Sequence, residues 1–106
     1  MTPITEATSY QVTASVSNAR PTHNTTVTVT ATLTNNGQPV AGATLDTVWN
    51  YKTTMSACSG GPSAANGMAS CARDISRATS GYTVTIDVTM TYQGKQYRAT
   101  TSFTPQ

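Results

Sequence analysis

The sequence predicts an all-β fold, an immunoglobulin-like Greek-key sandwich of about seven antiparallel strands. Residues 82–92 place an apolar side chain at every second position, with threonine or aspartate between, which is the period of a strand with one face in a core. Residues 25–34 repeat the pattern. No stretch of ten residues has the helical period, and about seven short strands in a chain of 106 residues are typical of this class of sandwich.

The remaining strands follow from the same alternation and from the turn-forming residues between them. Asn36 and Gly37 can adopt the positive φ of a tight turn, and residues 93–95 turn the chain back before the last strand. The segment 52–67 is irregular and rich in Ser, Gly and Ala, so we expect a short edge strand and a loop there. The other predicted strands are residues 10–17, 25–34, 43–51, 68–75, 82–92 and 97–103.

The phase of the strands identifies the residues expected in the core. Trp49 lies on the third strand, where sandwiches of this class bury an indole. Tyr82 opens the penultimate strand, where a tyrosine hydroxyl can bond the backbone of the preceding corner. Both are therefore predicted core residues. Tyr92 and Tyr97 share the inward phase of their strands, whereas Asp87 falls on the outward phase.

Composition makes the surface polar without making it highly charged. Charged residues are 9% of the chain, and 23 threonines supply hydroxyl groups while their β-branched side chains favour extended backbone. The six basic residues are scattered, so no stripe for nucleic acid is visible, and no apolar run is long enough for a transmembrane helix. We expect a monomer or weak dimer that neither binds nucleic acid nor inserts into a membrane.

Cys58 and Cys71 are the two cysteines of the chain, and they bracket a Gly-rich excursion. This arrangement suggests a disulfide and an oxidising compartment. Closing a loop of about fourteen residues contributes roughly 3 kcal/mol in the chain-entropy model. We expect the bond to clip a peripheral loop to a neighbouring strand. A zinc site is the alternative, but with His23 distant in sequence two thiolates do not complete a four-coordinate site.

The chain lacks the residue combinations of an enzyme or of a metal site. A serine triad needs Ser, His and a carboxylate in contact, and His23, the single histidine, lies in a polar turn where a surface role is expected. No Gly-x-Ser-x-Gly elbow occurs. The four acidic residues stand singly rather than at calcium-binding spacing: Glu6, Asp46, Asp74 and Asp87. No catalytic residue, cofactor or metal is predicted.

An internal Lys to Asn isopeptide bond has loose candidates in Lys52, Asn50 and Asp87. Because that cross-link needs a buried carboxylate and Asp87 lies on the polar phase of its strand, ordinary surface roles are favoured.

Carbohydrate binding is the alternative function. Sandwich modules grip sugars with aromatic side chains on a flat or concave face, and the available rings are Trp49, Tyr51, Tyr92 and Tyr97. The inward phase of Tyr92 and Tyr97 and the expected burial of Trp49 favour packing over binding.

Two segments resemble a known family. Residues 36–45 read Asn-Gly-Gln-Pro-Val-Ala-Gly-Ala-Thr-Leu, which resembles the corner of bacterial immunoglobulin-like repeats of the invasin and intimin type. Residues 65–69, Ala-Asn-Gly-Met-Ala, resemble the turn before a later strand of those repeats. The resemblance covers most of the chain and implies a non-catalytic spacer, binding tip or accessory domain of a surface or secreted protein. Those repeats generally lack this cysteine pair, so the likeness is one of architecture.

The sequence thus predicts one domain, residues 1–106, excised from a larger bacterial protein that is secreted or held at the cell surface. The N-terminus carries no recognisable secretion signal. Expected partners are the neighbouring domains of the parent chain, with a protein or polysaccharide ligand in addition. Because rigid scaffolds carry binding residues on loops, the predicted binding element lies between the cysteines. Its candidate residues are Ser59, Gly60, Gly61, Pro62, Ser63 and Asn66.

Overall fold

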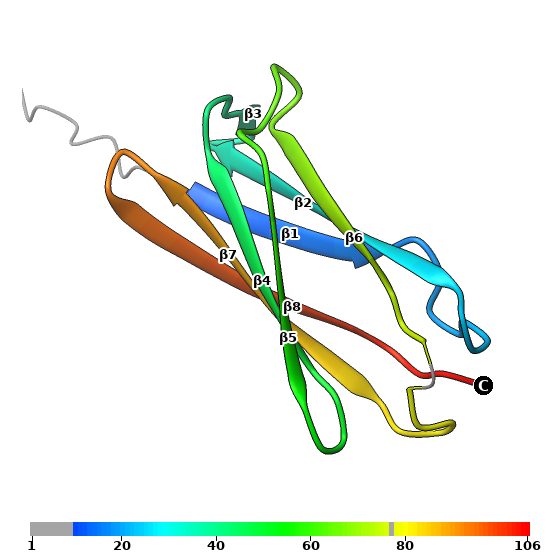
Figure 1. Cartoon of the computed structure of the whole chain (residues 1–106). Helices are drawn as coiled ribbons and strands as arrows, with labels where there is room; N and C mark the ends of the chain where they lie inside the picture. Colours follow the sequence, from blue (N-terminus) through cyan, green and yellow to red (C-terminus); the bar gives the residue numbers. More distant parts are fainter. Residues whose placement is uncertain (1–9, 77) are drawn as a thin grey trace, which may run out of the picture.

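The computed structural model describes residues 10–76 and 78–106, which form eight strands in antiparallel sheets (Figure 1). Within these residues, no helix has the length and apolar character needed to cross a membrane. The predicted all-β class is confirmed. The strands are β1 (Tyr10–Val16), β2 (Thr26–Asn35), β3 (Gln38–Pro39), β4 (Thr44–Asn50), β5 (Met55–Gly60), β6 (Met68–Asp74), β7 (Val84–Tyr92) and β8 (Lys95–Phe103).

The strands are divided between two sheets. One sheet has the order β1-β2-β6, with the two-residue β3 paired to the end of β2, and the other has the order β5-β4-β7-β8. The chain crosses between the sheets on its way to β4, again between β5 and β6, and again between β6 and β7. This is the Greek-key arrangement of an immunoglobulin-like sandwich, with β5 beside β4 as an additional edge strand of its sheet.

The core lies between the sheets and is built from the inward side chains that the alternation identified. Trp49 has no exposed surface, so its predicted place in the core is confirmed, and its ring lies edge-on to Phe103 with centroids 5.6 Å apart. The other large buried side chains include Val27, Val29, Leu33, Leu45, Val84, Ile86, Val88 and Met90.

Tyr82 is not a core residue, and that prediction is wrong. Its side chain is 38% exposed, and its N–H donates to the Thr79 carbonyl in a turn. Strand β7 begins two residues later, at Val84, which pairs with Phe103 at the last position of β8. Sheet pairing ends there, so Tyr82 keeps the alternating phase in sequence but lies outside the strand that would direct it inward.

The two sheets are joined differently at their two edges. Between β1 and β8, the ring of Tyr10 stacks on Tyr97 with centroids 4.7 Å apart and lies 6.1 Å from Tyr92. Between β5 and β6, Cys58 and Cys71 form the predicted disulfide, with a Cα–Cα distance of 6.1 Å. The bond joins edge strands of opposite sheets rather than clipping a loop, because the chain is still in strand β5 at Cys58.

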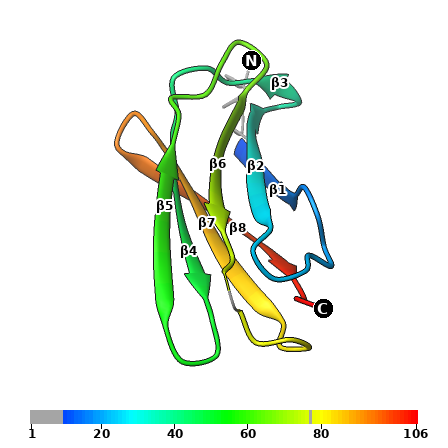
Figure 2. The ribbon, with the colours of Figure 1, turned by 45° about the vertical axis from the view of Figure 1, so that its right-hand side comes forward.

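The ends of the sandwich differ in what they carry. Figure 2 shows the β4–β5 turn, the β6–β7 connection and the C-terminus at the same end. The clustering of Tyr10 with Tyr92 and Tyr97 places the start of β1 at the other end, beside the β7–β8 turn.

Candidate functional site

The predicted binding loop between the cysteines is partly a structural segment. Ser59 and Gly60 belong to β5. Ser63 is buried; its hydroxyl accepts a hydrogen bond from the Ala43 N–H at 3.0 Å and donates to the Val40 carbonyl at 2.7 Å. These bonds fix the segment to the start of β4, so Ser63 does not present its side chain to a ligand. The expectation of a free loop over these residues is therefore corrected.

The other three loop candidates, Gly61, Pro62 and Asn66, line a hollow of about 440 Å³ together with Met68. The Asn66 side-chain oxygen accepts a hydrogen bond from the Met68 N–H at 3.0 Å, which closes the turn before β6. Their part in binding remains a prediction.

Trp49 belongs to a buried polar network that sequence reasoning missed. The Thr47 hydroxyl donates to the Cys58 carbonyl at 2.8 Å, accepts from the Trp49 Nε1–H at 2.9 Å and lies 3.3 Å from Cys71 Sγ. The sequence feature that could have revealed this network is Thr47 itself, a hydroxyl residue at an inward position between Leu45 and Trp49. Because the indole is fully buried and its donor is satisfied, Trp49 is not a platform for a ligand.

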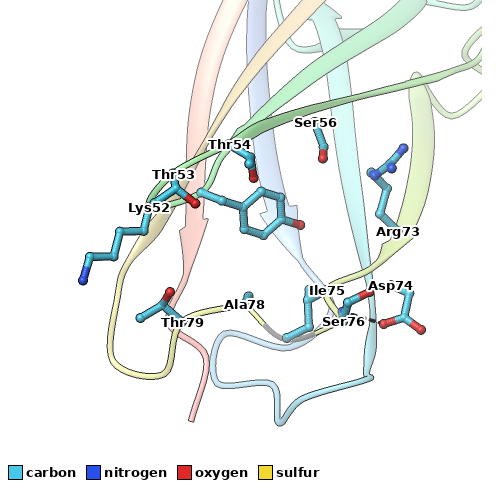
Figure 3. A pocket seen from close by; sticks show the side chains of 11 residues that line it. Lys52, Thr53, Thr54, Ser56, Arg73, Asp74, Ile75, Ser76, Ala78 and Thr79 are labelled. Atoms are coloured by element: carbon cyan, nitrogen blue, oxygen red, sulfur yellow. Dashed lines mark hydrogen bonds between the residues drawn. The ribbon is translucent and has the colours of Figure 1, made fainter.

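A cleft of about 320 Å³ opens between the β4–β5 turn and the segment that ends β6 and follows it (Figure 3). Residues of both elements line it, although the Lys52 and Asp74 side chains point away from the space between them (Figure 3). The first wall consists of Tyr51, Lys52, Thr53, Thr54 and Ser56. The second consists of Arg73, Asp74, Ile75, Ser76, Ala78 and Thr79.

The first wall is shaped by a tight turn after β4. The Tyr51 N–H donates to the Thr54 carbonyl at 2.9 Å, and the Tyr51 ring lies edge-on to Phe103 with centroids 6.5 Å apart. Burial raises the pKa of the Tyr51 hydroxyl; the charge of Arg73 lowers this pKa and that of Asp74 raises it further. The hydroxyl is therefore protonated at neutral pH and can both donate and accept hydrogen bonds.

Two charged side chains of the second wall are held by local hydrogen bonds. Arg73 Nη1 donates to the Ala57 carbonyl of β5 at 2.9 Å, across the edge that the disulfide also joins. The Asp74 Oδ1 accepts from the Ser76 N–H at 2.7 Å. Both bonds leave most of the hydrogen-bonding capacity of the two side chains unused.

The floor of the cleft is apolar. Ile75 is 3% exposed and Ala78 is 9% exposed, and both pack against the main core. The Ile75 N–H donates to the Thr25 carbonyl and the Ala78 N–H to the Ile75 carbonyl, each at 3.0 Å. This part of the wall is thus fixed by the fold.

His23 lies closer to a serine than the sequence suggested. Its Nε2 lies 3.2 Å from Ser80 Oγ, and the Ser80 hydroxyl donates to the Gln106 carbonyl at 3.0 Å. Because that proton is engaged, Ser80 accepts from His23, which is the reverse of the direction in which a general base activates a nucleophile. The contact ties two loops to the C-terminal segment. In the described part of the chain, no group of three or more His, Cys, Asp or Glu side chains is placed to hold a metal ion.

The three residues considered for an isopeptide bond are not brought together as a set. Asn50 Nδ2 donates to Asp87 Oδ2 at 3.0 Å on an exposed face of the second sheet. Lys52 lies at the cleft and extends away from the other labelled side chains (Figure 3). The buried carboxylate that such a bond requires is not formed by Asp87.

No protein family model matches the chain, and no curated protein sequence matches it. Among solved structures, it is similar to the crystal structure of BslA, a bacterial hydrophobin, with a TM-score of 0.44 and 13% sequence identity. That alignment covers 92% of this chain and 100% of BslA.

Proposed function

We propose that the chain is a non-catalytic, extracellular immunoglobulin-like module that spaces or presents neighbouring domains of a bacterial surface or secreted protein. The observation that carries the proposal is the course of the chain through the sandwich. Strands β1 and β8 run side by side in the same direction, since Tyr10 meets Tyr97 near the start of both and the Thr104 N–H bonds the Ala19 carbonyl beyond their ends. Strand β1 therefore begins at one end of the sandwich, and β8 ends at the other.

The exit is held rigidly. The Gln106 N–H donates to the Pro21 carbonyl at 2.9 Å, and the Gly81 N–H donates to the Pro105 carbonyl at 2.7 Å. Pro21 and Pro105 are buried. The residues after β8 are thus an extension of the folded body, which suits a module that fixes the direction of whatever follows it.

The strand pairing also suits a module that bears a pulling force along the strands, from one end of the sandwich to the other. A force between the two ends acts parallel to β1 and β8, which are paired over seven and nine residue positions with β2 and β7. In this geometry the hydrogen bonds of a ladder resist together rather than one after another. The disulfide between Cys58 and Cys71 supports an oxidising, extracellular compartment.

Force spectroscopy on a tandem array of the chain tests this role. Pulled through its ends, each copy is expected to unfold in one distinct event. Reduction of the disulfide should add about 40 Å of contour length per copy, because 13 residue steps are released and the bond already spans 6.1 Å between the two Cα atoms. Extension without a distinct unfolding event would refute the mechanical role. An open reading frame for this chain without any further domain would refute the role as a spacer.

A further inference from the structure

Strand β5 is an edge strand whose free side is covered by contacts with the other sheet. It pairs with β4 on one side, and its other side faces β6, an edge strand of the opposite sheet. We propose that this free side of β5 is a surface for strand pairing with a second copy of the chain, and that the Cys58–Cys71 disulfide and the Arg73 side chain keep it covered. This role goes beyond the mechanical one and does not depend on it.

The composition of β5 gives its edge little protection. The strand reads Met-Ser-Ala-Cys-Ser-Gly and contains neither a charged residue nor a proline. Met55 is 73% exposed, and Ala57 is exposed as well. Edge strands are commonly guarded against pairing by lysine, other charges or proline. The edge strand at the other side of the same sheet, β8, contains Lys95 and Arg98. Strand β5 therefore depends on its contacts with β6.

Three contacts cover the free side of β5. Cys58 is bonded to Cys71 in the middle of β6, with a Cα–Cα distance of 6.1 Å. Arg73 Nη1 donates to the Ala57 carbonyl at 2.9 Å. At the end of the strand, Gly60 lies so close to β6 that an added Cβ would overlap the Ser70 carbonyl oxygen.

The hydrogen bond of Arg73 identifies the backbone groups that another strand would use. Because its donor arrives from β6, the Ala57 carbonyl is directed away from β4. In an antiparallel pair, the N–H and C=O of one residue point to the same side of the strand. The backbone N–H of Ala57 is therefore directed toward the free side as well, and both groups suit a further strand.

Reduction of the disulfide removes the covalent contact without touching the β4–β5 ladder. Two thiol groups of a reductant supply two electrons and two protons; the S–S bond breaks, Cys58 and Cys71 become thiols, and the reductant becomes a disulfide. Strand β5 keeps its six paired positions with β4. The side-chain contact that remains across this edge is the exposed hydrogen bond from Arg73, and a single bond of this kind is a weak connection. The edge of β5 is then open to another strand.

A second copy of the chain fits this edge. Antiparallel pairing of β5 with β5 of another copy is two-fold symmetric, so the same surface serves both partners. Since β5 carries no charge, no like charges meet across the new pair. Met55 and Ala57 are two residues apart and so lie on the same face, where they add apolar contact to the main-chain hydrogen bonds. The two four-stranded sheets would join into one continuous sheet.

Sedimentation velocity of the full chain, with and without dithiothreitol, tests the proposal. It is measured from about 10 μM to about 1 mM, a range that detects weak association. The oxidised chain should stay monomeric, and the reduced chain should dimerise at least about tenfold more tightly. The near-UV circular dichroism of Trp49 should stay the same in both states, because pairing through β5 leaves the core intact.

Two pairs of variants of the reduced chain locate the contact. Ala57→Lys places a charge on the edge and should weaken the dimer at least about tenfold. Thr85→Lys is its matched control, because Thr85 is exposed on the same face but belongs to β7, an interior strand. Arg73→Ala uncovers the Ala57 carbonyl and should strengthen the dimer about threefold. Arg98→Ala removes the same charge from β8 and should leave the dimer unchanged.

Four results would overturn the proposal. One is a reduced chain that stays monomeric over the whole concentration range. A second is an oxidised chain that associates as tightly as the reduced one. A third is association accompanied by loss of the near-UV signal of Trp49, which would assign it to unfolded chains. The fourth is equal weakening by Ala57→Lys and Thr85→Lys, which would place the contact on the face of the sheet rather than at its edge.

Discussion

Replacing Thr47 by Val should destabilise the domain because it leaves the Trp49 indole donor without a partner. Valine has nearly the volume of threonine, so packing is conserved while the hydroxyl is lost. That hydroxyl accepts from Trp49 Nε1 at 2.9 Å and donates to the Cys58 carbonyl at 2.8 Å. A buried donor without an acceptor costs about 1–3 kcal/mol, and Trp49 has no exposed surface, so we expect a loss of about 2 kcal/mol. For a domain of this size, that lowers the Tm by roughly 10 °C.

The measurement is urea unfolding followed by far-UV circular dichroism, with Thr47→Ser as the matched control that keeps the hydroxyl. A double-mutant cycle isolates the contact, because Trp49→Phe removes the donor. In a chain that already carries Trp49→Phe, the further change Thr47→Val should cost about 1 kcal/mol less than in the unmodified chain. Either a loss below about 0.5 kcal/mol for Thr47→Val or additive effects in the cycle would refute the network as a source of stability.

Three further predictions use the same unfolding assay. Gly60→Ala should lower the free energy of unfolding by at least about 2 kcal/mol, because an added Cβ would overlap the Ser70 carbonyl oxygen. Gly94→Ala, which lies in open space at φ 77°, should lower it by only about 1 kcal/mol. Equal losses would contradict the close approach of β5 and β6. Reduction of the Cys58–Cys71 bond should lower the free energy of unfolding by about 3 kcal/mol, and an unchanged urea midpoint would contradict this. The pKa of Tyr51 is raised in the folded state, so its contribution is complete below its ordinary pKa of 10.0 and is lost as the pH rises through the higher folded value. Stability should therefore fall more steeply above pH 10 for the unmodified chain than for Tyr51→Phe, and parallel pH profiles would contradict the shift.

The alternation of apolar and polar residues was enough to predict the sandwich because each main strand buries one face. It located Val84, Ile86, Val88 and Met90 correctly. It failed at Tyr82, because a period of two carries no information on where pairing stops, and pairing stops where β8 ends at Phe103. The end of a strand is set by its neighbour, which lies elsewhere in the sequence.

The disulfide was predictable as a pair but not as a connection between sheets. Two cysteines on either side of a Gly-rich excursion in a small chain are sufficient to suggest a bond. Which sheets it joins depends on β5 pairing with β4 while β6 pairs with β2, and that choice is tertiary. The Thr47 network has the same origin, since it assembles around that connection.

The cleft was not predictable, because its walls come from segments that are distant in the sequence and meet only after both sheets have formed. Tyr51 was recognised as an aromatic candidate, but Arg73 was seen only as one of several scattered basic residues. Asp74 stood singly in the sequence, and its local role is visible only in its bond to the Ser76 N–H. Arg73 and Asp74 are neighbours in β6, but successive side chains of a strand point to opposite faces, so only Arg73 lies on the face toward β5.

At each side of the sandwich, an edge strand of one sheet lies near an edge strand of the other, which limits the exposure of the strand edges in a chain with little charge. Exposed edges are commonly guarded by lysine and other charges, and charged residues are only 9% of this chain. Here each edge faces the edge of the other sheet: the stacked rings of Tyr10 and Tyr97 close one side, and the Cys58–Cys71 bond with the Arg73 hydrogen bond to Ala57 closes the other. Contact between the two edges limits pairing with another chain, as charged residues do in other sheets. The hydroxyl-rich outer faces of the sheets remain exposed to water. On this reasoning the disulfide contributes to solubility as well as to stability, because it holds β5 against β6.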